Sequence, residues 1–160
     1  MAGSSQVAPP GVGVKRCGQE VSMDLLYTAE ATARGGREGE VVSDDGALDL
    51  MLAYPKELGG PGGDTTNPEQ LLAGAWSACF HNAMKLVAKK LGLDVSASSV
   101  TAKVSLGAVD KQFCLEATLI GHLPGLDQQD AQELMDRTHD VCPISKAIGA
   151  NIPVGLEATV

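Results

Sequence analysis

The first third of the chain has the extended pattern of apolar and polar positions typical of β-strands. Residues 25–33 and 40–43 have strand-compatible composition, and the GGREG segment between them is a turn signal, so a hairpin is expected with Arg37 at or near its tip. SDDGA is a second turn, and LDLMLAY (48–54) after it predicts a third strand that ends at Pro55. Three antiparallel strands are therefore expected before the first helix, followed by a long glycine-rich connection.

The middle of the chain changes to helical periodicity. Asn67 can cap a helix, Pro68 suits its first position, Gln70 stands where a capping box places Glu or Gln, and Gly92 supplies a stop. The apolar residues between these signals recur at helical spacing: Leu72, Ala75, Trp76, Cys79, Ala83, Leu86 and Val87. This pattern predicts a long, largely apolar and central helix.

The last third of the chain predicts a second hairpin, two more helices and a final strand. Residues 100–106 and 113–120 alternate as strands, 124–141 form an amphipathic helix, Pro143 opens a short third helix, and 151–160 close as a strand. In the second strand of this hairpin, one face is expected to carry Phe113, Leu115, Ala117 and Leu119, and the other Cys114, Glu116 and Thr118. The order βββαββααβ predicts an α+β fold of antiparallel sheet strands and a long central helix, without βαβ repeats.

Composition and charge narrow the class of protein. The 160 residues are 44% apolar but only 3% aromatic, which fits one domain whose core is built from Ala, Val, Leu and Met. A formal net charge of −8 and a pI near 4.7 leave no basic stripe for phosphates, so nucleic acid and membrane surfaces are not expected as partners. No apolar run approaches the ~20 residues that span a bilayer.

The N-terminal leader differs in composition from the rest of the chain. Residues 1–24 are rich in Gly, Pro and Ser and lack the apolar segment of a secretory signal, so they are predicted to be disordered, with a single domain over residues 25–160. The four cysteines are too few and too scattered for a disulfide scaffold, and no C-x-x-C pair points to zinc. A cytoplasmic location is therefore expected.

The positions of the four cysteines alone do not establish a function. Cys79 lies on the apolar stripe of the predicted helix, where packing as a small hydrophobe is the favoured explanation. Cys142 lies directly before Pro143 and so near a helix N-terminus, where a functional thiolate and a chance placement are equally supported. Cys114 is expected to be structural and Cys17 adventitious.

The charged residues and histidines are also ordinary when considered singly. Arg37 in a glycine-rich turn is commonly a solvated charge, and Glu69 in a first helical turn is commonly a favourable partner of the helix dipole. His81, His122 and His139 are scattered, and no HExxH or Cys/His cluster joins them, so no metal site is expected.

Several motifs in series resemble a known family. They are LYTAEATARGGREG, ELGGPGGDTTNPEQLLAGAWSACF, LPGL and VCPIS, in that order and at compatible spacing, from about Leu26 to the C-terminus. The sequence resembles the Ohr/OsmC superfamily, and the spacing between NPEQLLAGAWSACF and VCPIS is closer to the organic hydroperoxide resistance (Ohr) branch. Trp76 and His81 depart from the residue types expected in that pattern.

The resemblance implies a role for four residues. Cys79 would be the peroxidatic thiol and Cys142 the resolving thiol, with Arg37 and Glu69 as polar partners of Cys79. Attack of the thiolate on a hydroperoxide would release an alcohol and leave a sulfenic acid, with which Cys142 condenses to a disulfide. The implied reductant is dihydrolipoamide or a lipoylated protein, and no bound cofactor is expected.

Substrate contacts and assembly follow as expectations. Leu72, Trp76 and Phe80 are expected to line an apolar recess beside Cys79 that suits an alkyl or lipid hydroperoxide. Glu69 and Cys79 stand ~15 Å apart along one straight helix and ~80° apart around it, so they are poor candidates for one compact site. An intertwined homodimer is therefore predicted, in which the polar pair of one subunit faces the thiol of the other, although a long Arg37 that bridges the distance within one subunit stays an alternative.

Two other functions fit the same residues. A general thiol-disulfide oxidoreductase is the first, although the missing C-x-x-C argues against it. A non-catalytic binding module is the second, in which the cysteines only pack and the pocket holds a fatty acyl chain.

Overall fold

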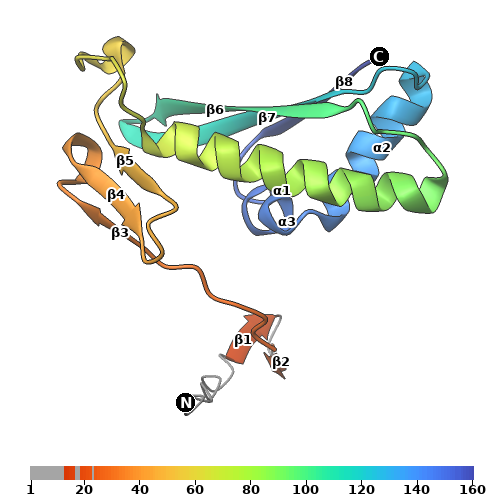
Figure 1. Cartoon of the computed structure of the whole chain (residues 1–160), viewed down its shortest axis with the longest axis horizontal. Helices are drawn as coiled ribbons and strands as arrows, with labels where there is room; N and C mark the ends of the chain where they lie inside the picture. The colour runs from red at the N-terminus through yellow and green to blue at the C-terminus, as the bar shows by residue number, and fades with distance from the viewer. Residues whose placement is uncertain (1–12, 17–18, 23) are drawn as a thin grey trace, which may run out of the picture.

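The computed structural model describes residues 13–16, 19–22 and 24–160. A long helix, α1, lies along one face of a three-stranded sheet with two shorter helices beside it, and a second small sheet lies beyond its N-terminal end (Figure 1). The elements in chain order are β1 (Gly13–Arg16), β2 (Gln19–Ser22), β3 (Ala31–Arg34), η1 (Gly36–Glu38), β4 (Glu40–Ser43), β5 (Asp49–Met51), η2 (Lys56–Leu58), α1 (Pro68–Leu91), β6 (Ser99–Val109), β7 (Gln112–His122), α2 (Gln128–Val141), α3 (Pro143–Ile148) and β8 (Val154–Thr159). From β3 onward this order confirms the predicted α+β class.

The leader contains a short hairpin. Within the segment that composition predicts to be disordered, β1 and β2 pair as antiparallel strands, with Gly13 opposite Ser22 and Arg16 opposite Gln19. Disorder of the leader as a whole stays a prediction. Residues 1–12, 17–18 and 23 lie outside the described residues, and the expectation for Cys17 lies there too.

The first sheet is the antiparallel β3-β4-β5 and is shorter than predicted. The first strand begins at Ala31 rather than at Leu25, because residues 24–30 pair with no strand among the described residues. Arg37 lies on η1, at the turn between β3 and β4, as predicted. Gly35 precedes it with a φ of 76°, a left-handed conformation that glycine adopts without strain.

Helix α1 begins and ends where the sequence predicts. The side chain of Asn67 accepts a hydrogen bond of 2.9 Å from the backbone N–H of Gln70, Pro68 is the first helical residue, and Gly92 closes the helix with a φ of 72°. These contacts satisfy backbone groups that a helix end otherwise leaves unpaired. The 24 residues of α1 therefore form one continuous rod that carries Glu69 near its start and Cys79 near its middle.

The second sheet has the order β6-β7-β8. Its hairpin is longer than predicted and turns through Asp110 and Lys111, whose φ angles of 50° and 64° fit a type I′ turn. Strand β8 pairs with β7 in the parallel sense, which corrects the expectation of antiparallel pairing throughout. The reason is that α2 and α3 form a crossover, so the chain returns to the same end of the sheet and makes one βαβ connection.

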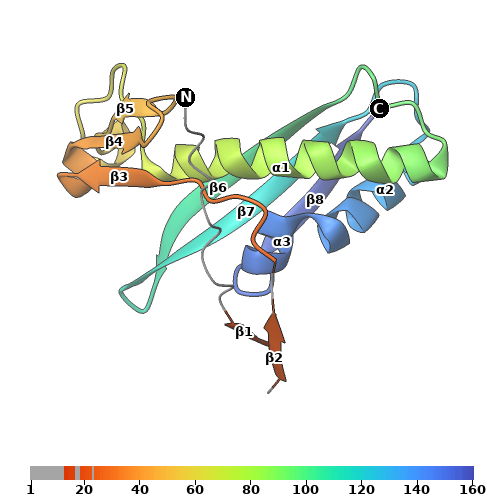
Figure 2. The same ribbon diagram turned by 60° about the horizontal axis from the view of Figure 1, so that its bottom comes forward.

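The core lies between this sheet and the helices. The predicted alternation of β7 is confirmed, since Ala117 and Leu119 are buried on the helix side while Cys114 and Glu116 are exposed. The same fully or nearly fully buried cluster includes Trp76, Phe80, Met84, Ala88, Leu134, Met135 and Cys142. Figure 2 shows α1 crossing the sheet at this layer, with α2 and α3 beside it. No helix in the described part of the chain is long and apolar enough to cross a membrane.

Candidate functional site

Two cysteines that are far apart in the sequence meet between α1 and α3. Cys79 lies near the middle of α1, and Cys142 occupies the junction that ends α2 and caps α3. The two sulfur atoms are 3.7 Å apart, and both thiols are free. A disulfide needs a sulfur–sulfur separation of about 2.05 Å, so a small movement of side chains or of α3 is enough to form one.

The two thiols differ in their access to solvent. Cys142 is fully buried, with 0% of its surface exposed, whereas Cys79 is only partly buried. A molecule that approaches from solution therefore meets the sulfur of Cys79 first. The two thiols, which the position of Cys142 at a helix start did not distinguish, therefore differ in exposure.

The pKa of Cys79 is raised within the single chain. Burial is the main cause; the backbone N–H of Ile144 on α3 acts in the opposite direction, and the neighbouring Cys142 raises the pKa further. Among the described residues, no cation is one of these influences. The single chain thus brings the two thiols together without supplying the positive charge that a reactive thiolate needs.

A partly buried positive charge lies elsewhere in the chain, in a pair formed by Arg37 and Glu69. The guanidinium of Arg37 donates two hydrogen bonds to the carboxylate of Glu69, of 2.8 Å from Nη1 and 2.5 Å from Nη2. Both side chains are partly buried, with 28% and 15% of their surfaces exposed. The hydrogen bond with Arg37 lowers the pKa of Glu69 against the opposing effect of burial, and the same bond raises the pKa of Arg37.

The pair and the thiols are separated along α1. Glu69 lies in the first turn of the helix and Cys79 ten positions later, which is about 15 Å along the axis. Both terminal nitrogens of Arg37 are engaged with Glu69, so its guanidinium is held at the start of the helix. Within one chain, the structure therefore brings together Arg37 with Glu69, and Cys79 with Cys142, as two separate halves.

A hollow of about 1010 Å³ opens beside the Arg37–Glu69 pair. Its walls come from the start of α1, the β6–β7 hairpin and the segment before β8, and they include Leu72, Leu106, Phe113, Leu115, Ile152 and Pro153. Leu72 lines this hollow but Cys79 does not, so the apolar recess expected beside Cys79 stays a prediction. Trp76 and Phe80 do not line the hollow; they lie further along α1 and are fully buried in the core.

Among the remaining candidate residues, Cys114 also lines the hollow beside the Arg37–Glu69 pair. Cys114 is exposed on the polar face of β7, opposite Gly107 of β6. A ring nitrogen of His81 lies 3.1 Å from the hydroxyl of Ser98, and one of His122 lies 3.2 Å from that of Thr159. In the part of the chain that the structure describes, no group of three or more His, Cys, Asp or Glu side chains is placed to hold a metal ion.

Two contacts at the thiols were not predicted. The backbone N–H of Ile144 acts on the sulfur of Cys79, and the indole N–H of Trp76 donates a buried hydrogen bond of 2.9 Å to the hydroxyl of Ser145. The only sequence signal for the second contact is the spacing, since Trp76 lies three residues before Cys79 and Ser145 three residues after Cys142.

The Arg37–Glu69 pair leads to a prediction about stability and pH. The depressed pKa of Glu69 implies stabilisation that is fully present above the ordinary carboxyl pKa and is lost as pH falls through the depressed value. Arg37→Ala should therefore lower the free energy of unfolding at pH 7 by about 1–2 kcal/mol. Denaturant titrations of both proteins at fixed concentration should show this difference shrinking as pH falls below about 4.

Arg34 supplies the matched control for this prediction. It forms a single-contact ion pair of 2.9 Å with Glu40, but its side chain is 67% exposed. Arg34→Ala should therefore cost about 0.5 kcal/mol or less at either pH. Equal effects of the two substitutions would show that the Arg37–Glu69 pair behaves as an ordinary surface ion pair.

The sequence and the fold of this chain are similar to those of known proteins. Residues 60–157 match the family model described as OsmC-like protein. The chain is 48% identical over 133 residues to the organic hydroperoxide resistance protein of Xanthomonas axonopodis pv. citri, covering 82% of this chain and 94% of that protein. It is 43% identical over 136 residues to the organic hydroperoxide resistance protein OhrB of Bacillus subtilis, covering 82% and 97% of the two chains. The crystal structure of an organic hydroperoxide resistance protein from Legionella pneumophila superposes with a TM-score of 0.79 at 45% identity, covering 86% of this chain and 100% of that one.

Proposed function

This chain belongs to the OsmC-like family, and from that premise we propose that it is a thiol-dependent peroxidase that reduces organic hydroperoxides in defence against oxidative stress. The observation that carries the proposal is the pair of free thiols 3.7 Å apart, of which only Cys79 reaches the surface. An attacking thiol must be accessible, whereas a resolving thiol needs only to be adjacent.

The proposed reaction has three balanced steps. The Cys79 thiolate attacks the outer oxygen of the hydroperoxide, the O–O bond breaks, and the departing alkoxide takes a proton to become an alcohol, which leaves Cys79 as a sulfenic acid. The sulfur of Cys142 then attacks the sulfur of that sulfenic acid, and the hydroxyl departs as water to leave a disulfide. A dithiol next reduces the disulfide and is itself oxidised to a disulfide.

The reductant is proposed to be a small dithiol such as dihydrolipoamide or a lipoylated protein. In the disulfide, the sulfur of Cys142 is expected to stay buried, so the donor would attack the sulfur of Cys79. The first donor thiol would form a mixed disulfide with Cys79 and release the Cys142 thiol. The second donor thiol would then attack the donor sulfur of that mixed disulfide, which releases the Cys79 thiol and leaves the donor as a cyclic disulfide. This route needs no resident cofactor.

We further propose that two copies of the chain share each site. Within one chain, the cation that a Cys79 thiolate needs is held about 15 Å away along α1. If the α1 helices of two subunits pack together, the Arg37–Glu69 pair of one can face the thiols of the other. The exposed positions Gly74, Ala75 and Ala78 on α1 suit such an approach, because small side chains let two helices pack closely.

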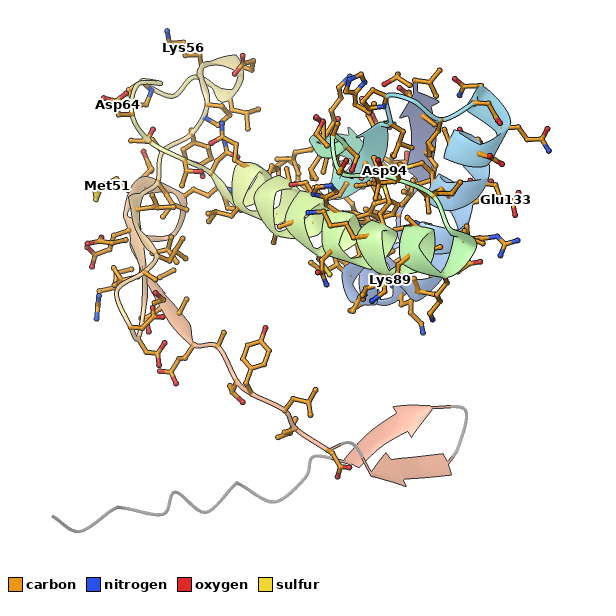
Figure 3. The ribbon with its side chains drawn as sticks, turned by 45° about the vertical axis from the view of Figure 1, so that its right-hand side comes forward. Met51, Lys56, Asp64, Lys89, Asp94 and Glu133 are labelled. Carbon is orange, nitrogen blue, oxygen red and sulfur yellow. The ribbon has the colours of Figure 1, made fainter. Side chains whose placement is uncertain are left out.

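Exposed apolar surface supports the same dimer. Large apolar side chains that are more than half exposed in the single chain include Leu26, Tyr27, Met51, Leu58, Leu86, Val109 and Phe113. Figure 3 shows Met51 on the small sheet, away from the body formed by the second sheet and the helices. A surface of this kind is typical of a chain that buries it against a partner. A homodimer with two equivalent sites would cover the exposed apolar surface and would also bring a cation to each pair of thiols.

A steady-state assay tests the proposed function. Purified protein with dihydrolipoamide, regenerated by lipoamide dehydrogenase and NADH, should consume cumene hydroperoxide with a kcat/KM at least about tenfold above that for hydrogen peroxide, because the apolar hollow favours an apolar substrate. Reduction of insulin disulfides without hydroperoxide consumption would instead identify a general oxidoreductase. If the protein has neither activity and Cys79 does not react with iodoacetamide at neutral pH, the chain is instead a non-catalytic module that binds an acyl chain.

A further inference from the structure

Two side-chain contacts hold α3 against α1, and they lie one helical turn apart. The first joins the sulfurs of Cys79 and Cys142 at 3.7 Å, and the second is the buried hydrogen bond of 2.9 Å from Trp76 to Ser145. Trp76 precedes Cys79 by three positions, and Ser145 follows Cys142 by three. Residues three apart in a helix lie on the same face, so the two contacts are adjacent links between the same pair of helices.

We propose that the Trp76–Ser145 hydrogen bond is the positioning contact that keeps Cys142 within reach of Cys79 for disulfide formation. This inference rests on the proposed peroxidase function, and it concerns the second step of that reaction. Trp76 and Ser145 act through the thiols and touch neither the hydroperoxide nor the reductant. The sequence predicts that Trp76 contacts the substrate, whereas this proposal makes it a residue that positions Cys142.

The position of α3 depends strongly on this bond. Helix α3 has only six residues, and in the described part of the chain Trp76–Ser145 is the one side-chain-to-side-chain hydrogen bond that it makes to another element, beside the contact of the Ile144 backbone N–H with the sulfur of Cys79. The indole of Trp76 has 0% and Ser145 has 2% of its surface exposed, so no water replaces a partner that is lost. A displacement of α3 that separates the thiols would leave a buried donor and a buried acceptor unpaired, which the fold resists.

The chemical consequence concerns the lifetime of the sulfenic acid. Once Cys79 is oxidised, Cys142 competes with a second hydroperoxide molecule, which would add another oxygen and give a sulfinic acid that ordinary thiols do not reduce. Cys142 wins this competition only if its sulfur stays close, since closure to about 2.05 Å is needed for the disulfide. A displaced α3 would therefore leave the first step intact and increase the fraction of enzyme lost in each turnover.

The test compares Trp76→Phe, Ser145→Ala and the double variant in two measurements. In a Cys142→Ser background, the rate of the first step with cumene hydroperoxide should change by no more than about twofold. In the full chain, the fraction of Cys79 found as sulfinic acid per turnover, measured by mass spectrometry, should rise roughly tenfold, the size expected for the loss of one buried hydrogen bond. The double variant should be no worse than the more affected single variant, because both single changes remove the same bond.

Ser98→Ala is the matched control. This substitution removes the contact between the hydroxyl of Ser98 and the ring of His81. His81 lies on α1, as Trp76 does, but its contact with Ser98 does not involve α3. It should leave the sulfinic fraction at the wild-type value. An equal rise in Ser98→Ala would show that loosening α1 in general causes the effect, and would overturn the assignment to Trp76 and Ser145.

A measurement without peroxide separates this inference from the proposed function. Oxidised glutathione should form a mixed disulfide with Cys79, from which Cys142 displaces glutathione, and this closure should slow roughly tenfold in Trp76→Phe and Ser145→Ala. Unchanged closure would overturn the positioning role even if the chain is a peroxidase. Slowed closure in a chain that consumes no hydroperoxide would support the positioning role and sink the proposed function instead.

Discussion

Cys79→Ser is expected to reduce hydroperoxide turnover by at least about a thousandfold, because it removes the nucleophile itself. Cys142→Ser should behave differently and consume about one equivalent of hydroperoxide per Cys79 before it stops as a sulfenic acid. The reason is the geometry of the pair, in which Cys79 is accessible and Cys142 is fully buried behind it. Rapid mixing with one equivalent of cumene hydroperoxide, followed by mass spectrometry with a sulfenic-acid trap, measures both outcomes.

Cys114→Ser is the control for this comparison. Cys114 is a free cysteine too, and it lines the hollow on β7, but the thiol beside Cys79 is that of Cys142, so Cys114→Ser should still form the sulfenic acid on Cys79 and resolve it to a disulfide. The assignment would be reversed if Cys142→Ser were the inactive variant and Cys79→Ser accumulated a sulfenic acid on Cys142. A sulfenic acid on Cys114 would instead point to a different peroxide-reactive thiol.

Mixed dimers of Cys79→Ser and Arg37→Ala chains are expected to recover activity that neither parent has. If each site combines the thiols of one chain with the Arg37–Glu69 pair of the other, a heterodimer has one intact site and one that carries both defects. Random pairing of equal amounts makes half of the dimers heterodimers, so refolded mixtures should reach about one quarter of wild-type activity. Steady-state turnover after co-refolding, compared with each parent refolded alone, measures this recovery.

The structure supplies a control that should fail to recover. Cys79 and Cys142 meet within one chain, so a mixture of Cys79→Ser and Cys142→Ser chains places a defect in both sites of every heterodimer. This mixture should stay at the level of its parents. If the Cys79→Ser and Arg37→Ala mixture also stayed inactive while forming dimers, Arg37 would have to serve the thiol of its own chain, and the shared site would be wrong.

The parts of the fold that sequence predicts well are those determined by local chemistry. The ends of α1 follow from Asn67, Pro68 and Gly92, because each acts on backbone groups within a few residues of itself. The alternation along β7 is also local, since neighbouring side chains of a strand point to opposite faces. The same holds for the turn that presents Arg37, which depends on glycines beside it.

The parts that sequence predicts poorly depend on partners distant in the chain. Periodicity places Trp76 on α1 but does not say which neighbour its indole meets, and so its burial against Ser145 was missed. The direction of β8 depends on the length and path of the α2–α3 crossover, which no local pattern specifies. The Arg37–Glu69 pairing joins positions 32 apart and became a prediction only through family resemblance.

The position of Trp76 also gives this protein a built-in optical probe. It is the only tryptophan in the chain, it is fully buried, and it lies three residues before Cys79. Its fluorescence therefore arises from a single site next to the redox pair, shielded from quenchers in the solvent. Because a disulfide close to an indole quenches its emission, the proposed oxidation of Cys79 and Cys142 should lower the fluorescence of Trp76 in real time, without a dye.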